Sequence, residues 1–129
     1  YSIVYTGFNK LYPDGTLKKA VLSYTEPESN FSDLIYNNYI SSVTALFRNN
    51  KDLNTLPTWI NKFPYGDWPT YLWLIKDEGE IHYLNEVTAV YRVDIGISSP
   101  IIKVNSALLN VNLGILNCMF QDSNFENRM

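Results

Sequence analysis

The stretch FPYGDWPTYLWLIKDEGEIHYLNEVTAVYRVD, residues 63–94, decides the fold of this 129-residue chain. Its first apolar residues recur at the spacing of one helix face and then spread around the helix, at Trp68, Tyr71, Leu72, Trp73, Leu74 and Ile75. Asp67 stands just before them, where an N-cap carboxylate accepts from N–H groups two or three residues on. Pro69 suits a first turn, where its missing N–H costs nothing. The sequence therefore predicts a helix that is capped by Asp67 and is buried on more than one side.

A turn and two strands are predicted after this helix. Residues 76–79, Lys-Asp-Glu-Gly, end it, with Gly79 available as the left-handed cap. Apolar and polar residues alternate in 81–84 and again in 87–93, as in strands that bury one face. We interpret these segments as a two-strand ribbon. Glu86 is assigned a structural role, either at the turn between the strands or in an ion pair with Arg92.

The flanking segments predict an α/β fold. Residues 2–12 and 16–24 are strand-like and are joined by Pro-Asp-Gly, which favours a tight turn, so we expect an N-terminal hairpin. Residues 42–48 are β-like, and residues 54–62 predict a short helix with Pro57 in its first turn. Residues 101–120 predict a C-terminal helix that packs on the sheet or serves as an oligomer contact. Residues 96–100 are expected to break structure, and residues 121–129 to fray.

Composition and charge narrow the class of protein. The net charge of −3 gives the chain no positive potential that would attract nucleic acid or an anionic membrane. The single cysteine, Cys118, rules out an internal disulfide and fits a reducing compartment. No apolar run is long enough to span a bilayer, and we recognise no signal peptide. These features favour a globular cytoplasmic protein that does not bind nucleic acid.

Four motifs, taken in order, resemble the family 2 glycosyltransferases, which are inverting enzymes of the GT-A fold. They are Leu-Pro-x-Trp at 56–59, Gly-Asp-Trp-Pro at 66–69, Gly-x-Ile-x-Tyr-Leu-x-Glu-Val at 79–87 and Ala-Val-Tyr-Arg at 89–92. The resemblance covers residues 38–98 well and corresponds to the C-terminal, acceptor-side half of the family's catalytic domain. It implies that residues 1–129 form a single partial GT-A domain, with a mixed sheet, a buried central helix and a C-terminal helix. It also implies a parent enzyme of bacterial capsule or other surface polysaccharide synthesis, in the cytoplasm or peripheral at the inner face of the membrane.

The resemblance further implies a reaction. A sugar passes from a nucleotide-diphosphate donor to a hydroxyl of a glycan or lipid-linked acceptor, with inversion. Such a displacement needs a base at the acceptor oxygen, neutralisation of charge on the diphosphate, and alignment of the two substrates. Asp67 matches the position of the family's general base, and Trp68 beside it is assigned to substrate binding. A plain N-cap role for Asp67 is the alternative, and the two roles are compatible.

Four further residues are candidates for ligand contacts. Arg92 matches the family's Tyr-Arg and is placed at phosphate, or in an ion pair with Glu86 or Asp94. Ser42 and Thr44 lie in a stretch that borders the acceptor in the family, although their hydroxyls suit strand and loop backbone equally well. Asp94 stands where the family usually has His, and its carboxylate is a candidate ligand for Mg²⁺ or Mn²⁺. The family otherwise holds this divalent cation with an Asp-x-Asp motif, which the sequence lacks.

Without the donor-binding half, these 129 residues alone are expected to be inactive as a transferase. A non-catalytic carbohydrate-binding or protein-interaction module that keeps the acceptor scaffold is the alternative function. An unrelated α/β domain is a third interpretation. Because half of a domain leaves apolar surface exposed, a homodimer is also expected.

Overall fold

A computed structural model describes residues 1–49, 51–95 and 104–128. Its mixed sheet has the order β2 (Leu17–Lys19), β1 (Ile3–Leu11), β5 (Ile81–Arg92) and β3 (Glu28–Ser29), and β4 (Leu46–Phe47) also pairs with β1. β1 and β5 are parallel, and the other pairs are antiparallel. The chain is therefore a mixed α/β protein, as the sequence predicts.

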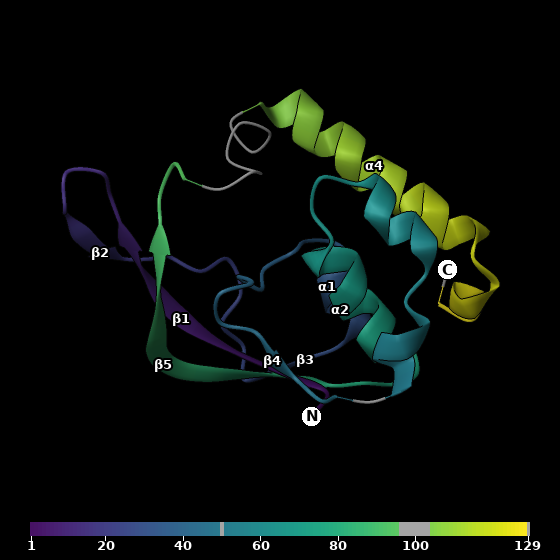
Figure 1. Ribbon diagram of the computed structural model, residues 1–129. Helices are drawn as coiled ribbons and strands as arrows, with labels where there is room; N and C mark the ends of the chain where they lie inside the picture. Colours follow the sequence, from purple (N-terminus) through teal and green to yellow (C-terminus); the bar gives the residue numbers. More distant parts are fainter. Residues whose placement is uncertain (50, 96–103, 129) are drawn as a thin grey trace.

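The helices gather on one side of this sheet (Figure 1). They are α1 (Phe31–Leu34), the 3-10 helices η1 (Lys51–Thr55) and η2 (Thr58–Lys62), α2 (Asp67–Ile75), α4 (Asn105–Gln121) and the 3-10 helix η3 (Ser123–Phe125). In Figure 1, α2 lies over the sheet, and α4 runs along the outside of the molecule beyond α2 and η2. Within the described residues, none of the helices has the length and apolar character needed to cross a membrane.

Helix α2 is the centre of the core, which confirms the predicted buried helix. All of its residues after Asp67 are buried except Thr70. The core that surrounds it comes from both the sheet and the C-terminal helices, and includes Ile3, Tyr5, Ile81, Ile115, Met119 and Phe125. A helix enclosed on both sides in this way needs apolar residues around most of its circumference.

The start of α2 differs from the prediction by one position. Gly66 is the N-cap, and its carbonyl oxygen accepts the N–H of Thr70 at 3.1 Å. Asp67 is the first helical residue, and its Oδ1 accepts the N–H of the adjacent Trp68 at 2.9 Å. The predicted capping of N–H groups two or three residues on is therefore wrong. The carboxylate still lies in the first turn, where the helix dipole favours an anion.

The end of α2 is also shifted by one residue. Glu78, with φ of 67°, is the left-handed residue, whereas Gly79 was predicted for that position. Gly79 is needed for space, because a Cβ there would lie 2.8 Å from both the Cα of Ile75 and the Oγ of Ser2. The glycine thus lets the chain that follows α2 pack closely against both Ile75 and Ser2, the residue just before β1.

Residues 81–92 form one continuous strand, β5, so the predicted two-strand ribbon is wrong. Pairing with β1 shifts on either side of Gly7: Leu84 lies opposite Thr6, and Val87 lies opposite Gly7. The extra residues of β5 bulge out of the ladder, and a bulge bends a strand and resets its alternation. In Figure 1, β1 and β5 turn upward together beyond the bulge, with β2 beside them at the end. We call this part of the sheet, which is β2 together with the segments of β1 and β5 that follow the bulge, the arm. Two alternating segments separated by a bulge therefore look like two strands in the sequence.

Glu86 lies in this bulge and has neither of its predicted roles. No turn between strands exists for it to fix, because β5 is continuous. The described residues also show no salt bridge between Glu86 and Arg92.

The N-terminal hairpin is present, with a shorter second strand than predicted. Gly15 has φ of 86°, and the carboxylate of Asp14 accepts the N–H of Thr16 at 2.8 Å, so the predicted turn chemistry is confirmed. β2 covers only Leu17–Lys19. After the N–H of Ala20 donates to the carbonyl oxygen of Phe8 at 2.9 Å, the chain leaves the sheet.

Two short segments also differ from their predicted form. Residues 42–44 form a turn, and only Leu46–Phe47 of the β-like stretch is a strand. Residues 54–62 fall in two 3-10 helices, η1 and η2, because Pro57 is extended, with ψ of 135°, and serves as the N-cap of η2. The fixed φ and missing N–H of proline explain why one continuous helix does not form.

Helix α4 packs against the segment that precedes α2, which corrects the predicted packing on the sheet. A Cβ at Gly114 would lie 2.8 Å from the ring of Phe63, so helix and ring are in close contact. The hydroxyl of Tyr65 donates to Oδ1 of Asn112. Ile115 and Met119 point into the core and are fully buried. Residues 96–103, which include the predicted break and the expected start of this helix, lie outside the described residues.

The end of the chain is packed, so the predicted fraying of residues 121–129 is wrong for its described part. Phe125 is fully buried, with ring centroids 5.7 Å from Trp73 and 6.1 Å from Phe31. Burial of one aromatic side chain stabilises a fold by several kcal/mol, about 3–5 kcal/mol by truncation to alanine. A single ring therefore orders a segment whose other residues are mostly polar.

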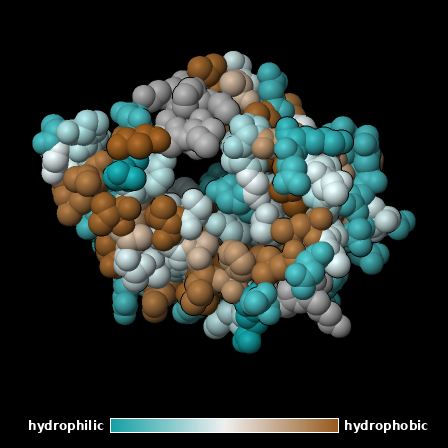
Figure 2. Space-filling view, in the orientation of Figure 1, coloured by the Kyte–Doolittle hydropathy of each residue, from teal (hydrophilic) through white to brown (hydrophobic). Residues whose placement is uncertain are grey.

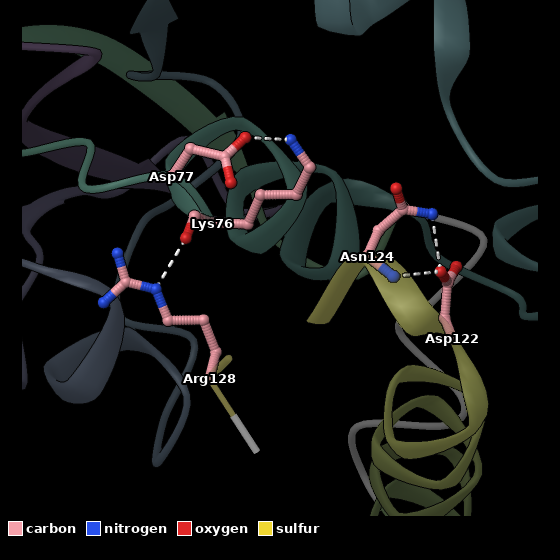
Figure 3. Close-up of polar contacts among 5 residues, drawn as sticks. All are labelled: Lys76, Asp77, Asp122, Asn124 and Arg128. Carbon is pink, nitrogen blue, oxygen red and sulfur yellow. Dashed lines mark hydrogen bonds and ion pairs between the residues drawn. The ribbon is translucent and has the colours of Figure 1, made fainter. Parts of the chain in front are cut away.

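Polar contacts on both sides of Phe125 secure the same segment (Figure 3). The carboxylate of Asp122 accepts the N–H of Asn124 at 3.0 Å and caps η3. Nε of Arg128 donates to the carbonyl oxygen of Lys76 at 2.6 Å, at the C-terminal end of α2. Arg128 thus supplies a hydrogen-bond donor for a carbonyl oxygen at the end of α2 that has no N–H partner within the helix.

Candidate functional site

Asp67 is the candidate residue with the most defined surroundings. It is partly exposed at the first position of α2, and the rest of that helix is held in the core. The N–H of Trp68 holds Oδ1 at 2.9 Å, which leaves Oδ2 as the oxygen that can accept from a ligand. A carboxylate fixed on a buried helix keeps one orientation, which a general base requires.

Two tyrosines lie close enough to Asp67 to be affected by its charge. Burial, with a further contribution from Asp67, raises the pKa of Tyr71 well above its usual value. The same two causes, burial first, raise the pKa of Tyr65. Both hydroxyls therefore remain protonated at neutral pH. The hydroxyl of Tyr65 donates a hydrogen bond to Asn112 of α4, so this residue connects the candidate site to the C-terminal helix.

Trp68 belongs to the core. Its side chain is 3% exposed, and its Nε1–H donates to the carbonyl oxygen of Leu34 at 2.9 Å. The ring has no open face on which a sugar can stack. The predicted substrate contact through Trp68 is not supported by this burial, and the residue instead anchors the start of α2 to α1.

The two hydroxyl candidates differ in their surroundings. Thr44 is 8% exposed, and its hydroxyl donates to the carbonyl oxygen of Ser41 at 2.9 Å. This is the backbone role that the sequence offers as its alternative for Thr44. Ser42 is exposed in the turn before β4 and remains a candidate for a ligand contact.

Arg92 and Asp94 lie together at the end of the arm. Arg92 is the exposed last residue of β5, opposite Leu11 of β1, and Asp94 follows in a turn with φ of 66°. In Figure 1 the end of the arm and helix α2 are separate parts of the molecule, and Figure 2 shows the surface of the molecule from the same side. The fold thus groups Arg92 with Asp94 and places Asp67 on a separate element.

No cluster of metal-ligating side chains is found among the described residues. They contain no group of three or more His, Cys, Asp or Glu side chains arranged to hold a metal ion. Asp94 offers a single carboxylate, whereas Mg²⁺ and Mn²⁺ take several oxygen ligands. Asp94 alone would have to share such a cation with other oxygen ligands, and no step below depends on that cation.

Sequence reasoning missed a pocket of about 380 Å³, lined by Gly7, Lys19, Ala20, Leu22, Thr25, Pro27, Tyr83 and Asn85. Its volume is at the lower end of the range for small-molecule sites. None of the predicted site residues lines it. The one available signal was Gly7, a glycine inside a strand, where a Cβ would lie 3.1 Å from the carbonyl oxygen of Glu86.

Comparison of the chain with protein-family models, with curated proteins and with solved structures found no match. The assignment of function therefore depends on the residues and their geometry.

Proposed function

We propose that this chain is the acceptor-side part of an inverting glycosyltransferase in which Asp67 is the general base. The observation that carries the proposal is the position of this carboxylate on the first turn of α2, with one oxygen held by the backbone and the side chain partly exposed. The motif resemblance around Asp67 supplies the reaction class.

In the proposed reaction the acceptor hydroxyl gives its proton to Oδ2 of Asp67. The acceptor oxygen attacks the anomeric carbon of the donor sugar, and the bond to the nucleoside diphosphate breaks on the opposite face. The electron pair of that bond leaves with the diphosphate, which inverts the configuration. General-base assistance of this kind contributes about 10²–10⁴-fold to the rate.

Arg92 is proposed to contact the diphosphate. A guanidinium can bind phosphate oxygens through two parallel N–H groups. Arg92 is exposed at the end of β5, as a contact with a separately bound donor requires. In this proposal the donor and its cation are held by residues beyond the described ones, so the 129-residue chain alone does not transfer sugar.

The proposed partners are a nucleotide-sugar and a glycan or lipid-linked acceptor. In this proposal the protein acts in the cytoplasm, in synthesis of a bacterial surface polysaccharide. The coding sequence just before Tyr1 is expected to contain an Asp-x-Asp motif, and its absence there would contradict the proposal.

The decisive experiment uses a longer protein that includes the coding sequence before Tyr1, and measures release of nucleoside diphosphate from a panel of nucleotide-sugars. Asp67→Asn keeps the shape of the side chain and removes its basicity, so turnover should fall by about 10²–10⁴-fold. Glu126→Gln is the matched control, because Glu126 is an exposed carboxylate on the C-terminal segment. Turnover within a few fold of wild type in Asp67→Asn would refute the role of Asp67 as base.

A non-catalytic carbohydrate-binding module is the second candidate, and the pocket beside Gly7 favours it. This pocket offers the ring of Tyr83, the amide of Asn85 and the hydroxyl of Thr25, and it does not involve Asp67. In that case the 129-residue chain should bind oligosaccharides with an affinity that Asp67→Asn leaves unchanged and Asn85→Ala lowers. Chemical-shift perturbation with a panel of oligosaccharides distinguishes the two functions.

A further inference from the structure

Helix α4 has no charged residue along its whole length. Its sequence, NSALLNVNLGILNCMFQ, contains no Asp, Glu, Lys, Arg or His. Helices on the surface of a globular protein normally turn a charged face toward solvent. The outer side of α4 therefore presents only uncharged side chains to solvent.

The outer side of α4 instead carries a second apolar stripe. Leu109, Leu113 and Phe120 are 57%, 54% and 70% exposed, and the half-buried Leu116 lies between the last two. We call these four residues the outer stripe. Their separations of four, three and four residues place them on one face of the helix. The inner face is a different one, since Ile115 and Met119 are fully buried in the core.

This spacing is that of residues that pack between two helices. Single exposed leucines are common on proteins, but an aligned series at the spacing of a helix seam indicates a partner helix. In Figure 1, α4 runs along the outside of the molecule, with α2 and η2 on its inner side. A hollow of about 380 Å³ lies beside Leu116 and has a mixed lining, which includes Ile35 and the 89% exposed Tyr36 but also Ser32 and Arg128.

We propose that the outer stripe binds a second copy of this chain, with the two α4 helices antiparallel across a two-fold axis. The separations of four, three and four read the same in both directions. Leu109 of one copy therefore meets Phe120 of the other, and Leu113 meets Leu116, so that each surface is its own complement. The antiparallel arrangement also brings opposite ends of the helix dipoles together.

The charge of the chain favours a second copy, rather than a lipid surface, as the partner of the outer stripe. Helices that lie on membranes carry Lys and Arg on their polar face, and α4 has none. The chain has a net charge of −3, which opposes approach to anionic lipids. An uncharged helix surface lets two copies with the same net charge meet without local repulsion. Four side chains on each copy form a small interface, so we expect a reversible dimer with a Kd on the order of 100 µM.

Sedimentation velocity of the 129-residue chain between about 10 µM and 1 mM tests the proposal, since this range brackets the expected Kd. The weight-average mass should rise toward twice the monomer mass. Leu113→Lys places a charge in the centre of the stripe and should weaken association at least about tenfold, a loss typical of a central interface residue. Two controls should associate as wild type: Asn110→Lys, exposed elsewhere on α4, and Val90→Lys, an exposed apolar position on β5.

Several outcomes would overturn the proposal. A wild-type chain that stays monomeric to 1 mM, a concentration well above the expected Kd, would do so. So would a Leu113→Lys variant that still dimerises, or a Val90→Lys variant that does not, which would assign the contact to the sheet. Monomeric wild type that floats with phosphatidylcholine vesicles, when Leu113→Lys does not, would assign the stripe to lipid. Circular dichroism verifies folding, and Phe120→Gln, at the most exposed position of the stripe, replaces Leu113→Lys if that variant unfolds.

Discussion

The two ends of β5 have different environments although they belong to one strand. Ile81, at the start, is fully buried beneath α2 and pairs with both β1 and β3. Val90, near the end, is 52% exposed in the arm, and among the described residues it pairs with β1 alone. Both ends carry β-branched residues in an alternating pattern, so the pattern itself does not determine burial. Coverage by helices does, and it reaches only one end of the sheet.

This difference separates stability from the candidate ligand contacts. The packed end contains the core around α2, and its apolar burial supplies the main driving force for folding. The arm presents Arg92 and Asp94 in exposed positions, and the start of α2 presents Asp67 from the packed end. Arg92 and Asp94 therefore lie outside the packed core around α2.

Truncation at the two ends of β5 gives the largest contrast. Ile81→Ala should lower the free energy of unfolding by about 2–5 kcal/mol, because it leaves a cavity in a packed core. Val90→Ala should cost less than about 1 kcal/mol, because the side chain is half exposed and loses mainly strand propensity. Urea denaturation of both variants measures the two values. Equal losses would show that the arm is as tightly packed as the core end.

A smaller pair of opposite effects is expected at the end of α2. Gly79→Ala should destabilise the protein by about 1–3 kcal/mol, because the new Cβ meets the backbone of Ile75. Glu78→Gly should stabilise it by up to about 1 kcal/mol, because Glu78 has the left-handed conformation that glycine prefers. The same denaturation experiment measures both. If Gly79→Ala were neutral, the close packing of Gly79 against Ile75 and Ser2 would be refuted.

The smallest predicted effect is on the loss of Tm at acid pH, and it comes from Asp122 in the packed C-terminal segment. Burial tends to raise the pKa of Asp122, but hydrogen bonds from Nε1–H of Trp59, at 2.9 Å, and from Asn124 lower that pKa below its usual value. A lowered folded-state pKa stabilises the fold fully above the unfolded value of about 3.9 and loses this contribution as pH falls through the folded value. Asp122→Asn should therefore reduce the loss of Tm below about pH 4 relative to wild type.

The exposed residue Glu126 supplies a control for this acid effect. Glu126→Gln removes the same charge from the C-terminal segment without the contact to Trp59. Its Tm should follow the wild-type dependence on pH. An identical acid profile for Asp122→Asn and wild type would contradict the contribution of the Asp122 contacts.

Features with local causes could be predicted from the sequence. The buried helix follows from apolar spacing, and the turn at Gly15 follows from residue chemistry within four positions. The position of Asp67 in the first turn of α2 could be predicted for the same reason. Only its hydrogen bond to Trp68 and the choice of Gly66 as cap required the structure.

Features that depend on distant residues could not be predicted. The bulge in β5 requires the partner strand to show that two alternating segments share one ladder. Burial of Trp68 depends on a carbonyl oxygen in α1, and the order of the C-terminal segment depends on Phe125 meeting Trp73 and Phe31. The pocket beside Gly7 combines three segments that are far apart in the chain.

The division of the sheet into a packed end and an exposed arm is the central claim, and native-state hydrogen exchange along β5 tests it most directly. Amides of residues 81–83 should exchange only through global unfolding, whereas amides of residues 88–92 should exchange through local opening and far more rapidly. Strong and equal protection from Ile81 to Arg92 would contradict the division. The arm would then be part of the stable core, and Arg92 could no longer be regarded as lying outside it.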